Sequence, residues 1–375
     1  ATSMREAIVL YDGDGREIWA VANVDGRSSA EVSELKAKGP GYEREFYDVS
    51  GETFALGALP RLNWLRKHQP ETFAKVRALS MINDWIGARL TGEITVEPTN
   101  GSTNGLIDLA TRDWSDALIA KAGLERSMFP RVVEPGEVVG QVTAAAAADT
   151  GLAEGTPFVA GGGDVQMGAL GLGLVEAGEA AVLGGTFWQQ VVNIPTGLVD
   201  ETMRLRVNSA ALPQMNQAEA ISFFVGLTAR WFRDAFCQQE IARAAVEGRD
   251  AYELMEDLAM QAPVGANGII PVFSDAMDFG NWYHAAPSFL NLSIDPAIAN
   301  KGSMFRAIQE NAAIVAAINL DRVESFAQVD STGPLTLAGG ASKGRLWPQI
   351  LADVTGRELR IPVVREATAL GGAAA

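Results

Sequence analysis

Residues 157–166 read Pro-Phe-Val-Ala-Gly-Gly-Gly-Asp-Val-Gln, and the rest of the chain is best interpreted outward from this stretch. Its first four residues form a short apolar run of strand type, and the pattern from Asp164 to about Leu172 is helical. The three glycines between them have no Cβ, so their backbone can approach a ligand closely and adopt a positive φ. A strand that ends in such a loop, just before a helix N-terminus, suits an anionic phosphate group.

The same junction occurs twice more in the second half of the chain. Residues 180–186 read Ala-Ala-Val-Leu-Gly-Gly-Thr, and residues 335–342 read Leu-Thr-Leu-Ala-Gly-Gly-Ala-Ser. One Gly-Gly pair usually marks only a tight turn, but three in equivalent contexts favour a nucleotide site. Neither the P-loop motif nor the G-x-G-x-x-G dinucleotide motif is present. Trp188 follows the second junction closely, so we expect its side chain to reach the same site.

Asp164 is the candidate catalytic group. A carboxylate on a glycine loop at the end of a strand is well placed to act as general base on a hydroxyl. The alternative is structural, because Asp is a common N-cap residue at the start of a helix. The local sequence leaves both interpretations open.

Composition narrows the class of protein. The chain has 375 residues, 47% of them hydrophobic and 20% charged, which predicts two packed domains and not a disordered chain. Its formal charge of −16 argues against a nucleic-acid partner. One cysteine and two histidines argue against a disulfide framework or a zinc cluster. No apolar stretch of membrane-spanning length and no signal peptide are present, so we expect no membrane partner and a cytoplasmic location.

Strands and helices alternate along the chain, which predicts an α/β fold. Residues 7–22 are expected to form two strands joined by the turn Asp12-Gly13-Asp14-Gly15. Two longer amphipathic helices are expected over residues 223–236 and 303–326. The change of pattern near residue 160 predicts one domain over residues 1–160 and a second over residues 161–375.

In order and spacing, these segments resemble the FGGY family of carbohydrate kinases over essentially all of the chain. Gly161–Gln166 is similar to the loop whose Asp deprotonates the sugar hydroxyl in that family. Residues 183–186 resemble its second phosphate segment, and residues 339–353 resemble its adenosine segment. Residues 3–6 stand where members bind polyol hydroxyls, and residues 23–27 take the place of a W-x-D-x-R segment, with Asn in place of Trp.

The resemblance implies a role for each matched residue. The catalytic base would be Asp164, which would also contact the metal ion. The substrate would be bound by Arg5, Glu6, Asp25 and Gln166. The nucleotide would be bound by Gly184, Gly185, Thr186, Gly339, Gly340 and Ser342.

The resemblance also implies a two-domain actin-like, ribonuclease-H-like ATPase fold with a central cleft. The first domain would bind a small sugar-like substrate, and the second would bind ATP with Mg²⁺ across its phosphates. The stretches Leu183–Gln190, Arg230–Cys237 and Trp282–Phe289 resemble one member in particular. Its substrate is the quorum-sensing molecule 4,5-dihydroxy-2,3-pentanedione, phosphorylated at the terminal hydroxyl. Glycerol or a ketopentose as acceptor, or binding without turnover, stay open, as does the oligomeric state.

Family members begin with a D-x-G-T strand and turn that supply the first phosphate-binding segment. No such segment precedes Ala1, and the chain stops where the family continues with a further helix. We therefore expect the first strands of the sugar-binding domain and the end of the ATP-binding domain to be missing. Whether this chain is active by itself is left open by the resemblance.

Overall fold

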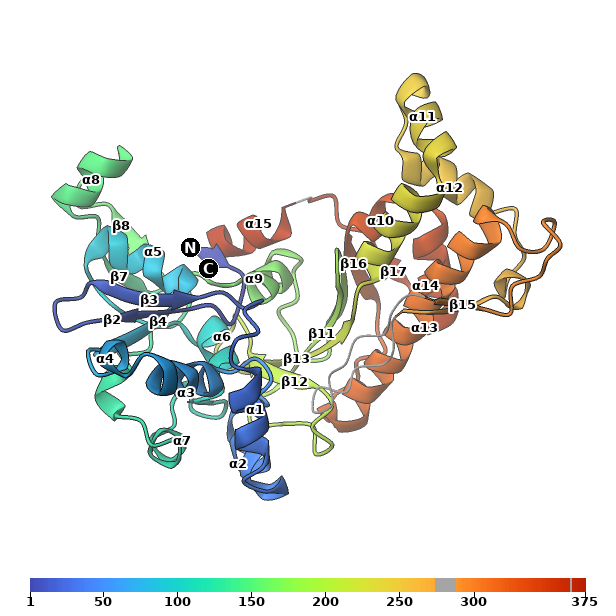
Figure 1. The fold of residues 1–375 in the computed structure, drawn as a ribbon. Helices are drawn as coiled ribbons and strands as arrows, with labels where there is room; N and C mark the ends of the chain where they lie inside the picture. The colour runs from blue at the N-terminus through green and yellow to red at the C-terminus, as the bar shows by residue number, and fades with distance from the viewer. Residues whose placement is uncertain (274–287, 365) are drawn as a thin grey trace. The chain divides into compact units, whose positions relative to one another are not determined.

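The computed structural model describes residues 1–273, 288–364 and 366–375, which form two compact units (Figure 1). The first unit comprises Ala1–Ala177, Asn193–Ala218 and Glu366–Ala375, and the second comprises Gly178–Val192 and Glu219–Arg365. Of the stretch Trp282–Phe289, which we matched to one family member, residues 282–287 lie outside the described residues. No described helix is both long and apolar enough to cross a bilayer.

The division into units differs from the boundary that we expected after residue 160, because residues 161–177 belong to the first unit. Strand β9 (Gly162–Gly163) pairs in parallel with β1 (Thr2–Ser3). Helix α9 (Asp164–Gly171) packs against α15 (Ala367–Ala374), drawn in red beside it in Figure 1. These contacts join segments that are distant in sequence, so a change in local pattern could not reveal them.

The first unit is built around an antiparallel sheet of three strands in the order β3–β2–β4. The central strand, β2 (Ile8–Tyr11), is buried at all four positions, between β3 (Glu17–Val21) and β4 (Ala78–Met81). The predicted hairpin between β2 and β3 is confirmed, since the Gly15 N–H donates to the Asp12 carbonyl and Gly15 has a φ of 74°. The acidic turn is therefore an ordinary connection.

Helices supply most of the remaining core of the first unit. Apolar side chains of α2 (Pro40–Ser50) and α3 (Ala58–His68), among them Phe46 and Leu62, join Leu10 in one buried cluster. Each such burial stabilises the fold by about 1.5–3 kcal/mol. The other elements of the unit are α1 (Ser29–Lys36), α4 (Pro70–Phe73), α5 (Ile82–Thr91), α6 (Pro98–Gly101), β5 (Ile107–Asp108), β6 (Asp113–Trp114), α7 (Asp116–Lys121), β7 (Val138–Gln141), α8 (Ala144–Thr150), β8 (Pro157–Val159) and β12 (Arg206–Ser209).

The second unit is built on strands in the order β11–β10–β16–β17. Strand β10 (Ala180–Gly184) is antiparallel to β11 (Trp188–Pro195) and parallel to β16 (Leu335–Gly339), which is parallel to β17 (Leu359–Arg360). The boundary between the units falls within β11 and within β13 (Met215–Ser222). The chain therefore passes between the units along continuous strands.

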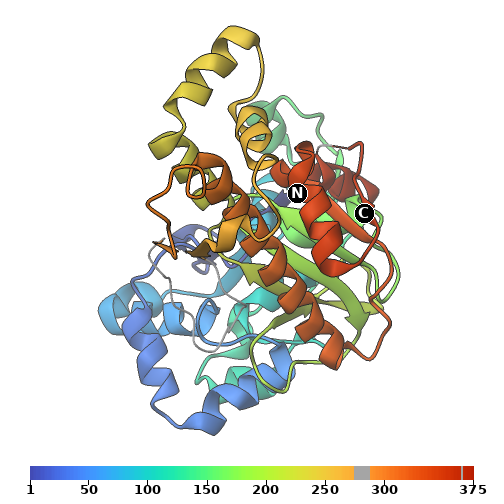
Figure 2. The same cartoon turned by 90° about the vertical axis from the view of Figure 1, so that its right-hand side faces the viewer.

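The two predicted helices of the second unit are confirmed as α10 (Val225–Phe236) and α13 (Lys301–Ala327). Helix α10 is amphipathic, whereas residues 305–309 of α13 are all buried, so this part of α13 has no exposed face. Asn300 and Ser303 form a reciprocal capping box at the start of α13, which satisfies backbone N–H groups there. The unit also contains α11 (Gln238–Glu247), α12 (Ala251–Ala259), β14 (Ile270–Val272), β15 (Ser288–Leu290) and α14 (Leu346–Thr355). Helix α11, in yellow, extends away from the strands of this unit (Figure 2).

Gly171 sets the approach of α9 to α15, and we predict that it tolerates no side chain. A Cβ there would lie 1.9 Å from the Ala367 carbonyl oxygen, and backbone cannot move aside as a side chain can. Gly171→Ala should therefore lower the free energy of unfolding by about 1–3 kcal/mol. The matched control is Gly41→Ala in α2, where a Cβ meets nothing within 4 Å and helix propensity favours Ala. Urea denaturation measures both, and equal stability of the two variants would contradict this packing.

Candidate active site

Asp164 is the first residue of α9 and follows directly on the glycine loop. The residue at the N-cap position is Gly163, so Asp164 is not the cap itself. The Gly163 N–H donates to Thr99 Oγ1 at 2.8 Å, and Thr368 Oγ1 donates to the Asp164 carbonyl at 3.1 Å. The carboxylate accepts from the Val165 N–H at 2.8 Å, and the side chain is 45% exposed. The backbone is thus fixed while the carboxylate stays accessible.

Arg5 lies beside Asp164, and Glu6 follows Arg5 in the connection between β1 and β2. The Arg5 Nε is 3.7 Å from Asp164 Oδ1. Both Arg5 and Glu6 are buried. Glu6 has a φ of 65°, and its N–H donates to Asn100 Oδ1 at 3.2 Å and to Thr103 Oγ1 at 3.3 Å. A left-handed, non-glycine residue that buried side chains hold in place is a common mark of a functional site.

Three arginines determine the charge of Glu6. Arg206 Nη2 is 2.7 Å from Glu6 Oε1, and Arg61 Nη1 donates to the Glu6 carbonyl. Burial by itself would raise the pKa of Glu6, but the charges of Arg206, Arg5 and Arg61 outweigh it and hold the pKa below its ordinary value. Glu6 is therefore a buried anion, able to accept hydrogen bonds from hydroxyl groups.

Asp25 lies at the edge of this group. Its two carboxylate oxygens accept from the Arg27 Nε at 2.8 and 2.9 Å, so its own loop engages the carboxylate. The loop reaches Glu6 through Asn23, whose Nδ2 donates to Glu6 Oε2 at 3.4 Å. Asn23, which stands in place of the family's Trp, is thus the member of this loop that touches Glu6.

Gln166 is buried behind the glycine loop. It is 1% exposed, and its Oε1 has no hydrogen-bond partner among the residues that the structure describes. A Cβ on Gly163 would lie 2.7 Å from this oxygen. The structure therefore brings Arg5, Glu6 and Asp164 together and packs Gln166 against the backbone that carries Asp164.

The two glycine junctions of the second unit lie side by side. Strands β10 and β16 are parallel neighbours in which Gly184 pairs with Gly339, so both loops leave the sheet at the same edge. A Cβ on Gly339 would lie 2.8 Å from the Gly184 carbonyl oxygen, and one on Gly226 would lie 2.3 Å from that of Gly185. Only glycine permits these approaches, and the carboxyl edge of parallel strands is where phosphate-binding loops form.

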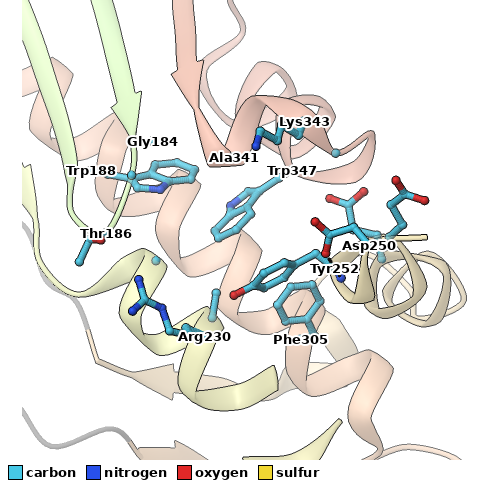
Figure 3. Close-up of a pocket in the computed structure, with 17 residues that line it drawn as sticks. Gly184, Thr186, Trp188, Arg230, Asp250, Tyr252, Phe305, Ala341, Lys343 and Trp347 are labelled. Atoms are coloured by element: carbon cyan, nitrogen blue, oxygen red, sulfur yellow. Dashed lines mark hydrogen bonds between the residues drawn. The ribbon is translucent and has the colours of Figure 1, made fainter. Parts of the chain in front are cut away.

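A cavity of about 310 Å³ opens beside these loops (Figure 3). Four of the six predicted nucleotide residues line it, namely Gly184, Gly185, Thr186 and Gly340. The other two, Gly339 and Ser342, are not part of its lining. The Ser342 hydroxyl donates to the Gly339 carbonyl at 2.8 Å and so braces the loop from within.

Aromatic rings form a wall of this cavity. The ring centroids of Trp188 and Trp347 are 5.0 Å apart, and that of Phe305 is 6.4 Å from Trp347. Tyr252 lies across the same space (Figure 3). Flat apolar rings around a cavity of this size suit a nucleoside base. Trp188 lines the cavity as expected, and Trp347 lies within the adenosine-like residues 339–353. Tyr252 and Phe305 were missed because they come from two helices without a motif.

Glu256 of α12 holds the loop that follows β16. Its Oε2 accepts from the Arg345 N–H at 2.9 Å, and its Oε1 accepts from the Gln309 side-chain amide at 3.2 Å. A Cβ on Gly344 would lie 2.1 Å from Glu256 Oε1. Charged side chains of both signs line the cavity, namely Arg230 and Lys343 with Asp250, Glu253 and Glu256.

The described residues contain no group of three or more Asp, Glu, His or Cys that could hold a metal ion. A magnesium ion that arrives with a nucleotide does not require one. It binds through one or two carboxylates and the phosphates, and keeps several waters. The accessible carboxylate of Asp164 fits such a role.

Comparisons with known proteins agree with this geometry. The model of the FGGY family of carbohydrate kinases, N-terminal domain, matches residues 1–171, and that of the C-terminal domain matches residues 193–375. Autoinducer-2 kinase of Klebsiella pneumoniae subsp. pneumoniae is 57% identical over 374 residues, which cover 100% of this chain and 70% of the relative. Autoinducer-2 kinase of Yersinia pestis bv. Antiqua (strain Angola) is 54% identical over 376 residues, covering 100% of this chain and 71% of the relative.

Solved structures of similar fold include xylulose kinase from Rhodospirillum rubrum, with a TM-score of 0.85 and 25% identity over 100% of this chain and 74% of that chain. Plasmodium falciparum glycerol kinase with ADP has a TM-score of 0.84 and 20% identity, over 99% of this chain and 73% of that chain. The expected α/β fold of the actin-like ATPase type is confirmed by these likenesses. The matches to both domain models and the 57% identity over the whole of this chain show that the chain is a phosphotransferase and belongs to the FGGY family of carbohydrate kinases.

Proposed function

We propose that this protein transfers the γ-phosphoryl group of ATP to the terminal hydroxyl of 4,5-dihydroxy-2,3-pentanedione, the autoinducer-2 signal of quorum sensing. The observation that carries the proposal is the group formed by Arg5, Glu6 and Asp164. It combines a buried cation, a buried anion and an accessible carboxylate within one unit. The identity of 57% and 54% to two autoinducer-2 kinases supports the choice of acceptor.

The first unit would bind the acceptor. Glu6 accepts a hydrogen bond from one hydroxyl, and Arg5 donates to a neighbouring oxygen. The Asp164 carboxylate takes the proton of the terminal hydroxyl, whose oxygen forms a bond to the γ-phosphorus as the bond to the β-phosphate oxygen breaks. Gln166 and Asp25 are the other two residues proposed for acceptor binding. Gln166 would support the Asp164 loop, and Asp25 would hold the loop that carries Asn23.

The second unit would bind ATP. The aromatic wall would take the adenine ring, and the backbone of Gly184 to Thr186 and of Gly340, which lines the cavity, would lie against the phosphates, with Gly339 and Ser342 shaping the second loop. A bound Mg²⁺ would supply neutralisation of phosphate charge, and Asp164 is the carboxylate that would contact it. Positioning and charge neutralisation supply most of the catalysis in such transfers. ATP supply places the proposed reaction in the cytoplasm.

A coupled ADP-release assay with three acceptors tests the proposed function. With the dione, glycerol and D-xylulose compared at equal concentrations, we expect the dione to give a kcat/KM at least about 10-fold above the other two, because unmatched buried polar groups penalise a wrong acceptor. A higher kcat/KM with glycerol or xylulose would contradict the choice of acceptor. ADP release at the same rate without any acceptor would contradict phosphoryl transfer itself.

Asp164→Asn tests the proposed base. Asn keeps the shape but cannot take a proton, so kcat should fall at least about 10²-fold while the Kd values for dione and ATP change little. Asp116→Asn is the matched control, because Asp116 is likewise the first residue of a helix in the first unit and its side chain is 81% exposed. Turnover close to wild type in Asp164→Asn would show that Asp164 is not the base.

A further inference from the structure

Arg206 joins two buried carboxylates of the first unit. It is the first residue of β12 and is 1% exposed. Its Nη2 lies 2.7 Å from Oε1 of Glu6 and 2.7 Å from Oε1 of Glu52. Glu52 is 1% exposed, and Glu6 is 5% exposed. One guanidinium group therefore pairs with two carboxylates that come from distant parts of the chain.

Glu52 fixes the orientation of the Arg206 fork. Glu52 Oε1 accepts from the Nε and Nη2 of Arg206 at 2.9 and 2.7 Å, and from the Asn208 side-chain amide at 2.8 Å. Its Oε2 is buried and has no hydrogen-bond partner among the described residues. Both Arg206 donors converge on the same carboxylate oxygen, and two contacts from one rigid guanidinium plane limit how that plane can rotate. The end of the fork that points to Glu6 is thereby set.

The backbone holds Arg206 and Glu52 together independently of Glu6. The Val207 N–H donates to the Gly51 carbonyl at 3.2 Å. Gly51 has a φ of 68°, and a Cβ there would lie 2.2 Å from the Val207 carbonyl oxygen. The position of Arg206 therefore does not depend on Glu6, and the Glu6 carboxylate orients against a guanidinium that is already held.

We propose that Arg206 is a positioning residue for the phosphoryl acceptor, holding the Glu6 carboxylate in its orientation, with Glu52 as the group that fixes Arg206. The inference rests on the proposed role of Glu6 in binding the acceptor. Arg206 acts through Glu6, since its own side chain is almost fully covered. Its loss should weaken acceptor binding much more than it slows the chemical step.

The test separates this role from a purely structural one. Arg206→Met alone leaves two buried carboxylates without their shared cation and is expected to be severely unstable. The double variant Arg206→Met/Glu52→Gln also replaces the Glu52 carboxyl by a neutral amide of the same shape, so its melting temperature should recover. Relative to Glu52→Gln alone, its Kd and KM for the dione should still rise at least about 10-fold, with kcat at saturation changed by less than about 3-fold. If Arg206 had only a structural role, the double variant would regain its dione affinity together with its melting temperature.

The matched control is Arg112→Met/Glu134→Gln, which removes another arginine–glutamate pair of the first unit. Arg112 is 6% exposed and lies 2.7 Å from Glu134. This control should lose stability and keep its dione affinity. If Arg206→Met/Glu52→Gln fails to fold, Arg206→Lys replaces it, because an ammonium keeps the charge but not the planar fork. The dione Kd of Arg206→Lys should then exceed that of the wild type at least about 10-fold, with kcat changed by less than about 3-fold.

Dione affinity in the Arg206 variant equal to that of Glu52→Gln would overturn the inference and leave the proposed function intact. Glycerol and D-xylulose are titrated alongside the dione. Wild-type protein that binds none of the three acceptors would overturn the proposed function and this inference together. Isothermal titration calorimetry and thermal unfolding supply the readouts.

Discussion

The interior of the first unit depends on one buried cation, Arg206, that is shared by two buried carboxylates, Glu6 and Glu52. Arg5 and Arg61 also act on Glu6, whereas Arg206 is the cation that acts on Glu52, so two ionised carboxylates would have to share Arg206, and an uncompensated buried charge is costly. The structure resolves this asymmetrically. Burial raises the pKa of Glu52 to about 7, whereas the charges of Arg206, Arg5 and Arg61 outweigh burial and lower the pKa of Glu6. The negative charge is thereby kept at Glu6, beside the loop that carries Asp164.

The two shifts act on stability in opposite directions. The pKa of Glu52 is raised from 4.5, so its contribution to stability is fully present below about 4.5 and is lost as the pH rises through about 7. The pKa of Glu6 is lowered from 4.5, so its contribution is present above that value and is lost as the pH falls through its folded pKa. The two carboxyl groups therefore stabilise the fold together at pH values between the lowered pKa of Glu6 and about 7. The charged or titratable groups that face Glu52 are Arg206, Glu6 and, more weakly, Tyr47.

Much of this architecture could be predicted from the sequence because its signals are local. Glycine after a short apolar strand marks a close backbone approach, and Gly184 and Gly339 prove to be paired neighbours at one sheet edge. Helical periodicity gave α10 and α13 within a few residues. What could not be predicted comes from contacts over long sequence distances. Because β9 pairs with β1, the loop that carries Asp164 belongs to the first unit. Because Val207 bonds to Gly51, its neighbour Arg206 lies next to Glu52 and within reach of Glu6. No spacing rule links such residues.

The most direct test is the titration of the glutamate carboxyl groups by ¹³C NMR in the wild type, Glu52→Gln and Glu6→Gln. The predicted result is one carboxyl with a pKa of about 7 in the wild type that disappears in Glu52→Gln, and another below 4.5 that disappears in Glu6→Gln. Since Arg206 faces both groups, removing one carboxylate should also shift the pKa of the other. A wild-type spectrum with no glutamate titrating near 7, or one in which that signal is lost in Glu6→Gln instead, would contradict the account.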